Sequence, residues 1–466
     1  MKKIYIYVLL ISLLNSILFY GYKLGINVIL FMIPLLCFIT YILYKNDKIV
    51  NKKGLLFIIP IILLSISYMI YDNMFFKDTN AFVIVILFNL MYIYTLNPTY
   101  KIKEVGESIF NLFIEPISII DKYWKEVKET VNESSKINDN AKNKIKSFII
   151  VIPIVVLVLF LLNSADMIFG SMFKDIFKIF EGISIDDLIG RLIIIVALFT
   201  FIGCTLKYLL TKFDKPNSKD IDFKIDNYTI KLLLTTLNVI YVVFDFIQIR
   251  SLMLHNVGNI NYAEYARSGF FELMFISIIN LVIILLSKYS KEDTKYNKVS
   301  CITMIFLTFI IIVSSFMRMY MYEMAYGYTL LRLLVYVSLI TEVILLIPTI
   351  AYIIKPNTNI FKYYMIIIIS IYTLVALMPI DYIIAKRNIN KYYVDKKIDI
   401  EYLENYSSDN LGLLVDLYNK TKDDKIRNSI GEYINNFKDM WKSKGFQDYN
   451  ISRSKVNKIL KNKIAK

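Results

Sequence analysis

Residues 330–354 read LLRLLVYVSLITEVILLIPTIAYII, and the only charged side chains in this run are those of Arg332 and Glu342. An α-helix rises about 1.5 Å per residue, so a helix of about 20 apolar residues crosses the hydrocarbon core of a bilayer. The run is long enough and apolar enough to do so, and it predicts a membrane-spanning helix.

Runs of the same kind recur through the chain of 466 residues, which is 56% hydrophobic and 20% charged, with a mean hydropathy of +0.52. A soluble globular protein carries more charge, about a quarter of its residues. About eleven runs approach the length of a bilayer, at 4–20, 25–44, 55–71, 81–96, 147–163, 187–210, 228–250, 269–288, 299–317, 330–354 and 363–380. The pattern predicts an all-α fold, a polytopic integral membrane helix bundle of about eleven transmembrane helices.

Basic residues are distributed unequally between the two sets of alternate connections. About twenty-two lie in one set, in the connections at 45–53, 101–146, 212–224, 291–298 and 355–362. About six lie in the opposite set, among them Lys23, Lys77 and Arg318. Because cytoplasmic connections are rich in Lys and Arg, the bias predicts a multi-pass plasma membrane protein with a cytoplasmic N-terminus and an extracellular C-terminus.

The membrane and non-membrane stretches predict four parts: N-terminal spans at 1–96, a cytoplasmic insert at 97–146, a core membrane bundle at 147–380 and an extracytoplasmic tail at 381–466. In the insert, apolar residues among polar ones predict an amphipathic helix in the membrane interface, with a break at Glu115–Pro116. In the tail, apolar residues recur at helical spacing, which predicts a small helical extracellular domain.

Charge also indicates the partners of the chain. The formal net charge is +15, but the lysines are concentrated in the connections between spans, so we expect no nucleic acid partner. The lipid bilayer is the main partner. The tail carries an excess of lysine, and we expect it to meet an extracellular ligand or an anionic cell-envelope polymer. No pattern in the sequence indicates an oligomeric state.

Residues that commonly perform catalysis or hold metals are scarce. His255 is the only histidine, and Cys37, Cys204 and Cys301 lie in separate apolar runs without paired spacing. The sequence contains no phosphate-binding loop, dinucleotide-binding motif, metalloprotease motif or hydrolase motif. We therefore identify no catalytic residue and no metal site, and we expect no cofactor.

The seventh predicted span carries a stripe of polar side chains, although polar groups are costly inside a membrane. Its members are separated by three or four residues and so share one helical face; they are Lys231, Thr235, Asn238, Tyr241, Asp245 and Gln248. Two interpretations are open. The stripe is either a helix–helix contact joined by hydrogen bonds or the wall of a path for a substrate or a proton.

A second group of charged and aromatic residues lies at the outer ends of the eighth, ninth and tenth predicted spans. Its members are Tyr262, Glu264, Tyr265, Arg267, Glu272, Arg318, Tyr322, Glu323, Tyr326 and Arg332. Either the arginines and glutamates join the helix ends through buried ion pairs, or they line a wet cavity in which arginines hold an external carboxylate or phosphate. Glu342, inside the tenth span, is a further buried acid.

Three stretches of the chain resemble a known family. YAEYARSGFFEL at 262–273 opens one span, RMYMYEMAYGYTLLR at 318–332 joins two others, and the tail contains Ser408-Asp409 and the pentapeptide YNISR at 449–453. Together they resemble an uncharacterised family of bacterial multi-pass membrane proteins, frequent in clostridia and other Gram-positive bacteria, that is filed as a domain of unknown function. The resemblance covers about residues 145–460 and implies an external C-terminal helical part, but no activity.

Three classes of function remain open. A structural, sensory or regulatory membrane component would use the tail as a binding module and the insert as its output. A transporter or channel would use the polar stripe. A membrane enzyme acting on lipid or cell-wall intermediates would need a nucleophile–base pair or a metal site, which the sequence does not supply. Because glycine, common in the broken helices of carriers, accounts for only 14 residues, the first class is favoured.

Overall fold

The structure is a computed structural model of the whole chain. It describes residues 2–96, 102–134, 185–211, 224–250, 269–291, 294–355, 357–404, 407–440 and 445–463. The predicted span at 147–163 lies outside these ranges, as do Tyr262, Glu264, Tyr265 and Arg267 of the outer group. Within the described ranges the chain is helical, and its only β contact is an isolated bridge between Ile225 and Ser290.

The first helices are α1 (Lys2–Phe19), α2 (Ile26–Lys45), the 3-10 helix η1 (Lys52–Phe57), α3 (Ile58–Ile70), α4 (Met74–Leu96), α5 (Ile102–Ser118), α6 (Ile120–Ser134) and α10 (Ile185–Thr211). Those that follow as far as the last apolar helix are α11 (Asn227–Gln248), α13 (Phe270–Leu286), η4 (Ser287–Tyr289), α14 (Lys295–Tyr326), α15 (Leu330–Ile354) and α16 (Ile360–Ala376). The tail consists of α17 (Ile380–Asp395), α18 (Ile400–Glu404), η5 (Ser408–Asn410), α19 (Leu411–Lys420), α20 (Asp424–Met440), η6 (Phe446–Asp448) and α21 (Ile451–Lys463).

Eight helical segments of the described residues are long and apolar enough to cross a membrane: Ile26–Lys45, Lys52–Ile70, Met74–Leu96, Gly190–Thr211, Asn227–Gln248, Phe270–Tyr289, Lys295–Tyr326 and Leu330–Ile354. Helices α16 and α17 reach the required length only together, with a bend of 62° between them, and α1 contributes a shorter apolar helix. The prediction of an all-α protein with many membrane helices is thereby confirmed.

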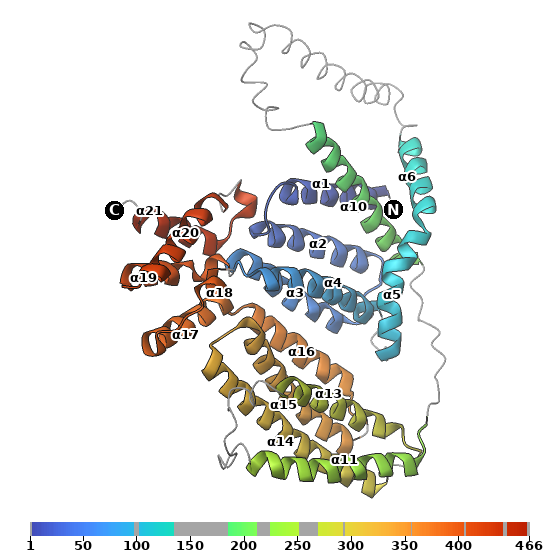
Figure 1. Cartoon of the computed structure of the whole chain (residues 1–466). Coiled ribbons are helices and arrows are strands. Elements are labelled where there is room, and N and C mark those ends of the chain that lie inside the picture. The colour runs from blue at the N-terminus through green and yellow to red at the C-terminus, as the bar shows by residue number, and fades with distance from the viewer. Residues whose placement is uncertain are drawn as a thin grey trace. The chain divides into compact units, whose positions relative to one another are not determined.

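The chain divides into two compact units. One comprises residues 1–58 and 86–217, and the other comprises residues 59–85 and 218–466. The first unit contains α1, α2, α5, α6 and α10, and the second contains α3, the first half of α4, and everything from α11 to the C-terminus (Figure 1). Each unit is described by itself below.

In the first unit, α1 and α10 are antiparallel neighbours. Near the end of α1, the hydroxyl of Tyr20 donates to Asp187 at 3.2 Å, and the guanidinium of Arg191 lies over the Tyr20 ring. At the opposite end, the hydroxyl of Tyr5 donates to Glu126 of α6 at 3.3 Å, and the same carboxylate pairs with Lys207 of α10 at 2.8 Å. Helix α6 therefore belongs to the end of the unit where α1 begins and α10 finishes.

Helices α5 and α6 have the two faces expected of interfacial helices. Phe110, Ile114 and Ile117 of α5 are spaced by four and three residues and are 46–63% exposed, whereas Leu112 is buried. Figure 1 shows α5 and α6 running across the direction of α1 and α2 rather than along it. The helix continues through Pro116 and breaks after Ser118, three residues later than the sequence predicts.

In the second unit, α14 is the central membrane helix, and α11, α13 and α15 pack against it. Met304, Ile311 and Met319 of α14 are completely buried in this core. Large apolar side chains on the outer faces, such as Val239 and Ile240 of α11, are more than half exposed. A face of this composition fits lipid, because hydrocarbon does not oppose the exposure of apolar side chains as water does.

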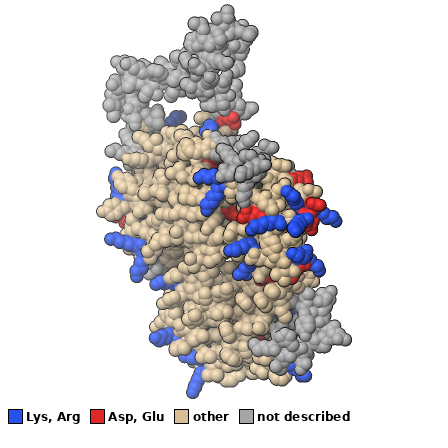
Figure 2. Space-filling model, turned by 90° about the vertical axis from the view of Figure 1, so that its left-hand side faces the viewer, with Lys and Arg blue, Asp and Glu red and all other residues tan. Residues whose placement is uncertain are grey.

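Helices α17–α21 form a second core in the same unit. Leu403, Leu411, Leu414 and Ile430 are completely buried in it, and they come from α18, α19 and α20. Figure 2 shows charged side chains of both signs gathered together on one face of the molecule, beside broad uncharged areas. A separate apolar core allows the tail to fold as a compact body beside the membrane helices.

Candidate functional site

The polar stripe of α11 meets polar groups of two neighbouring helices. Thr235 hydrogen-bonds with the hydroxyl of Tyr296, and the ammonium of Lys231 lies 5.9 Å from the centre of the same ring. The amide of Asn238 donates to the carbonyl of Ser300 at 3.0 Å. Both partners belong to the first turns of α14, so this half of the stripe joins two helices.

The second half of the stripe continues this contact. The hydroxyl of Tyr241 donates to Asn280 of α13 at 2.8 Å. The side-chain oxygen of Gln248 accepts hydrogen bonds from Ser314 and from the guanidinium of Arg318, both at 2.9 Å. Five of the six predicted stripe residues therefore contact α13 or α14, which is the arrangement of a helix–helix contact.

Asp245 is the exception in the stripe. It is only 2% exposed, and neither of its carboxylate oxygens has a hydrogen-bond partner among the described residues. An intramembrane acid without a donor is costly in its charged form. Asp245 therefore stands out as the one stripe residue that the contact with α13 and α14 does not explain.

Glu342, the acid predicted to be buried in the tenth span, lies in α15 and is 3% exposed. Its carboxylate accepts hydrogen bonds from Ser277 of α13 and from Ser338 one turn earlier in α15. One turn after Ser277, the amide of Asn280 donates to Thr308 of α14. Glu342 thus has neutral donors, whereas Asp245 has none among the described residues.

The members of the outer group in the described ranges do not form a single network of ion pairs. Glu272 is exposed at the start of α13. Arg318 is buried and donates to Gln248, and one of its guanidinium nitrogens lies beside Gly269. Arg332 stacks over the ring of Tyr322, which also lies 5.0 Å from the ring of Tyr326.

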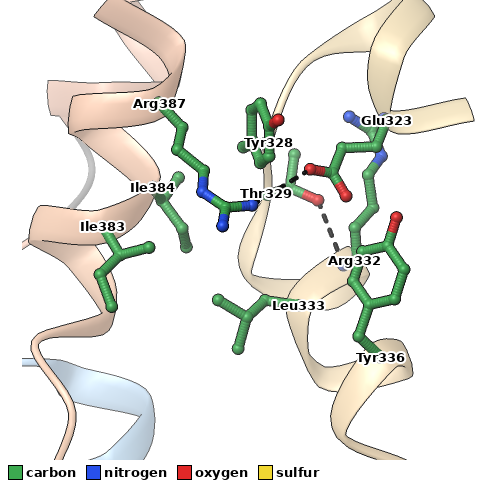
Figure 3. A pocket seen from close by; sticks show the side chains of 9 residues that line it. All are labelled: Glu323, Tyr328, Thr329, Arg332, Leu333, Tyr336, Ile383, Ile384 and Arg387. Carbon is green, nitrogen blue, oxygen red and sulfur yellow. Dashed lines mark hydrogen bonds and ion pairs between the residues drawn. The ribbon is translucent and has the colours of Figure 1, made fainter. Parts of the chain in front are cut away.

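Glu323 of this group pairs with a cation that belongs to the tail. It is 4% exposed, and one carboxylate oxygen lies 3.7 Å from the guanidinium of Arg387 in α17. Figure 3 shows the two side chains reaching toward each other across a small cavity of about 40 Å³, with Tyr328 beside them. The amide of Asn388 in α17 also donates to the carbonyl of Tyr328. Sequence reasoning missed Arg387, because α17 follows the predicted spans and has no fixed spacing from Glu323.

A more extensive polar cluster lies where the tail meets the turn between α3 and α4. Asp72 of that turn is completely buried, and its carboxylate pairs with Lys77 of α4 and with Arg453 of α21. The Arg453 distance is 2.6 Å. The amide of Asn450 donates to the carbonyls of Tyr68 and Tyr71, which caps the end of α3. The tail therefore holds both the acid of the turn and the last carbonyls of the preceding helix.

Two further carboxylates complete this cluster. Asp381, at the start of α17, accepts hydrogen bonds from Asn73 and from the amide and hydroxyl of Ser407. Asp409 of η5 accepts from the backbone amide of Asp72 at 3.0 Å and from the Ser407 hydroxyl at 3.1 Å. The turn cluster, as we call it, consists of Asp72, Asn73, Lys77, Asp381, Ser407, Ser408, Asp409, Asn450, Ser452 and Arg453.

Burial changes the acidity of these carboxyls. It raises the pKa of Asp381 to about 6, and the charge of Asp409 adds to the rise, while hydrogen bonds from Ser407 and Asn73 oppose it. Burial also raises the pKa of Asp409, with a contribution from Asp72. These acids therefore bind protons more strongly than exposed carboxyls do.

The turn cluster forms the floor of a large pocket. The pocket has a volume of about 560 Å³, within the range typical of small-molecule sites. Its polar floor contains Ser408, Asp409 and Ser452, and Lys455 and Asp416 also line it. The remaining lining comes from Ile70, Tyr71, Pro379, Tyr382, Gly412, Leu413, Val456 and Ile459.

The sequence contained part of the signal for this site. Ser408-Asp409 and the pentapeptide at 449–453 are the two tail stretches that carried the family resemblance, and the structure brings them together. Their partner Asp72 was missed, because a single acid in a short connection belongs to no motif. An acid followed five residues later by Lys77, both next to apolar runs, is the signal that could have found it.

A comparison with known protein families gives one match. A family model described as Domain of unknown function (DUF4153) matches residues 58–417. That range begins with α3 and ends in α19, so it includes Asp72, Asp381 and Asp409. No curated protein matches the chain, and no solved structure matches it.

Proposed function

The chain belongs to the family described as Domain of unknown function (DUF4153), and from this membership and the geometry above we propose that it is a sensory component of the plasma membrane. The membership confirms the resemblance inferred from the sequence. The matched region begins at residue 58 rather than near residue 145, so α3 and α4 are part of the family region. In our proposal the tail binds a ligand outside the cell, and its occupancy acts on the turn between α3 and α4.

The proposed topology has about eleven spans, a cytoplasmic N-terminus and an extracellular tail. The grouping of connections within the second unit supports it. The turn at Asp72 and the connection at Tyr328 both contact the tail. Ile225 and Ser290 pair with each other, and Lys288 reaches the last turn of α15. The positive-inside rule assigns the turn at Asp72 and the connection at Tyr328 to the outside. It assigns the connections at Ile225 and Ser290, and the one that follows α15, to the cytoplasm.

A single observation carries the sensory proposal: the 560 Å³ pocket shares its floor with the cluster that holds the turn between two apolar helices. Asp409 lines the pocket and also accepts a hydrogen bond from the backbone amide of Asp72. A ligand that displaces Asp409 therefore changes a hydrogen bond of the turn directly. That connection is what a sensor requires, since a ligand shifts a conformational equilibrium only by contacting its states differently.

The α11 stripe supports the same choice. Hydrogen bonds and a ring contact with α13 and α14 account for Lys231, Thr235, Asn238, Tyr241 and Gln248. Transporter sites are instead built where broken helices expose their ends to a cavity, whereas α11 runs from Asn227 to Gln248 without a break. A transporter remains the second candidate because of Asp245, which is buried without a hydrogen-bond partner among the described residues.

In the experiment that tests this proposal, a larger side chain fills the pocket and a fluorescent probe reports on the turn between α3 and α4. Gly412 of α19 lines the pocket, and a Cβ atom there would lie 3.3 Å from Ile459, so Gly412→Leu places a side chain in the cavity. An environment-sensitive fluorophore on Met74→Cys, in a chain with Cys37→Ser, reports on the first residue of α4. We expect Gly412→Leu to shift the emission of this probe in vesicles.

Gly431→Ala is the matched control, because its Cβ atom would make an ordinary contact of 3.4 Å with Tyr418 of the same tail. It should leave the emission unchanged. Proton flux is measured in the same vesicles with an internal pH-sensitive dye. An unchanged emission in the Gly412→Leu chain refutes the sensory proposal, and flux that disappears in Asp245→Asn establishes the transporter instead.

A further inference from the structure

The pocket beside the turn cluster opens at the level where apolar helices end. Ile70 is the last residue of α3 and closes an apolar segment that is long enough to span a membrane. Pro379 follows α16, directly before the bend into α17. Both residues line the pocket. Because membrane helices end where lipid head groups begin, the pocket lies within reach of a lipid in the adjoining leaflet.

The lining of the pocket has two chemistries. Ile70, Leu413, Val456 and Ile459 offer hydrocarbon, while the floor offers the hydroxyls of serines and the carboxylate of Asp409. A soluble metabolite would leave the apolar part unused, and a plain hydrocarbon would bury the Asp409 carboxylate further without bringing a positive charge to it. A molecule with a hydrocarbon chain and a polar head satisfies both parts.

The charges of the turn cluster indicate which charge the polar head group of such a ligand should carry. Lys77 and Arg453 form their ion pairs with the same carboxylate, that of Asp72. Asp381 and Asp409 accept hydrogen bonds from amides and hydroxyls, which are neutral donors. Within the turn cluster, three carboxylates thus face two cations, and Asp416 and Lys455, which also line the pocket, add one charge of each sign. A positively charged ligand group beside Asp409 would offset the remaining negative charge.

We propose that this pocket binds the head group of an outer-leaflet lipid that carries a primary ammonium. The ammonium lies against Asp409, the phosphate lies toward Lys455, and an acyl chain follows Ile70, Leu413, Val456 and Ile459. The proposal rests on the proposed sensory function and names the ligand class of that same pocket. It makes the amount of ammonium-bearing lipid in the outer leaflet the quantity that the protein reports.

The test uses the full chain in two sets of vesicles, one of phosphatidylethanolamine with phosphatidylglycerol and one of phosphatidylglycerol alone. A ligand present at about a hundred times its dissociation constant raises the melting temperature of a protein of this size by about 3–5 °C. We expect a rise of this order in the phosphatidylethanolamine vesicles. It should disappear in Asp409→Asn, which removes the charge that faces the ammonium, and in Gly412→Leu, which fills the cavity.

Asp395→Asn provides the matched control, because Asp395 is a partly exposed acid of the same tail that pairs with Lys391 four residues before it. It should retain the full difference between the two vesicles. If Asp409→Asn fails to fold, Gly412→Leu still decides the matter, since it leaves every charge in place. An equal melting temperature in both vesicles, or a difference that both pocket variants retain, overturns the proposal.

Adding soluble phosphoethanolamine to the phosphatidylglycerol vesicles tests whether the head group alone is sufficient as a ligand. If it gives the full rise in melting temperature, the ligand needs no acyl chain and the lipid proposal fails. The sensory proposal survives that result, because its own test is the response of the Met74→Cys probe to a filled pocket. The two proposals therefore fail on different measurements.

Discussion

The guanidinium of Arg453 donates to the carboxylate of Asp72 at 2.6 Å, across a separation of 381 residues in the chain. Asp72 is completely buried, and the side chain of Arg453 is only 11% exposed. The last helix of the chain is thus joined to the turn between two of its early apolar helices. A buried ion pair of this kind specifies where the tail docks, whatever its net contribution to stability.

Removing one partner of this pair should destabilise the tail strongly. Arg453→Gln leaves the buried carboxylate with Lys77 and a hydrogen bond from Ser408, and breaking buried pairs costs about 3–5 kcal/mol. Arg427→Gln is the control, because Arg427 is exposed on α20 and stacks on Tyr418. Thermal unfolding in detergent should show a clear decrease in melting temperature for Arg453→Gln and a small one for Arg427→Gln. Equal melting temperatures would contradict the role of the pair.

The stability of the tail should depend on pH through Asp381. Its pKa is raised to about 6 in the folded protein, whereas an unfolded aspartate titrates near 3.9. The folded state therefore holds a proton that the unfolded state releases between these values. The contribution of Asp381 to the free energy of unfolding should fall by about 3 kcal/mol as pH rises from about 4 to about 6, and stay level above that.

Asp381→Asn should flatten this part of the profile, because the variant has no proton to release there. Asp409, whose pKa is raised in the same direction, should contribute a slope that persists in the variant. Asp395→Asn, at a partly exposed site, should keep the wild-type profile. Chemical unfolding at a series of pH values measures the difference, and parallel curves for wild type and Asp381→Asn would contradict it.

The membrane helices could be predicted from the sequence because their signal is local: each apolar run carries its own evidence of length and composition. Contacts between distant segments carry no such signal. Nothing near Asp72 indicates Arg453, and nothing near Glu323 indicates Arg387. The polar stripe was found because helical periodicity places Asn238, Tyr241 and Gln248 on one face, yet periodicity does not reveal what that face meets. Its partners Asn280 and Ser300 depend on how α13 and α14 pack.

Asp245→Asn should leave the folded protein intact or stabilise it slightly. Neither carboxylate oxygen has a hydrogen-bond partner among the described residues, so an amide, which is neutral, costs less to bury. Asn238→Ala should instead lower stability by about 0.6–1.7 kcal/mol, because it removes a hydrogen bond to the Ser300 carbonyl. Melting in detergent compares the two variants. Loss of the Asp245→Asn protein from the membrane would mean that the carboxyl has a structural partner.

The side of the membrane on which each connection lies can be determined with cysteines introduced one at a time at four described positions, in a chain that carries Cys37→Ser. Asp424 of α20 and Asp187 of α10 should react with an impermeant maleimide on intact cells. Lys295 of α14 and Glu129 of α6 should react only after permeabilisation. The physical reason is the positive-inside bias together with the pairing of ends within each unit, where Glu126 meets Tyr5 and Lys207 at the end of the first unit opposite Asp187.

Glu129 and Asp187 make the sharpest comparison in this set. They belong to consecutive described helices of the first unit, α6 and α10, but to opposite ends of it. The sequence predicts a span at 147–163 between them, which supplies the change of side. If both positions react from outside, or neither does, the count of about eleven spans fails. If all four reactivities are inverted, the grouping of the ends stands, and the tail lies in the cytoplasm where it meets no outer-leaflet lipid.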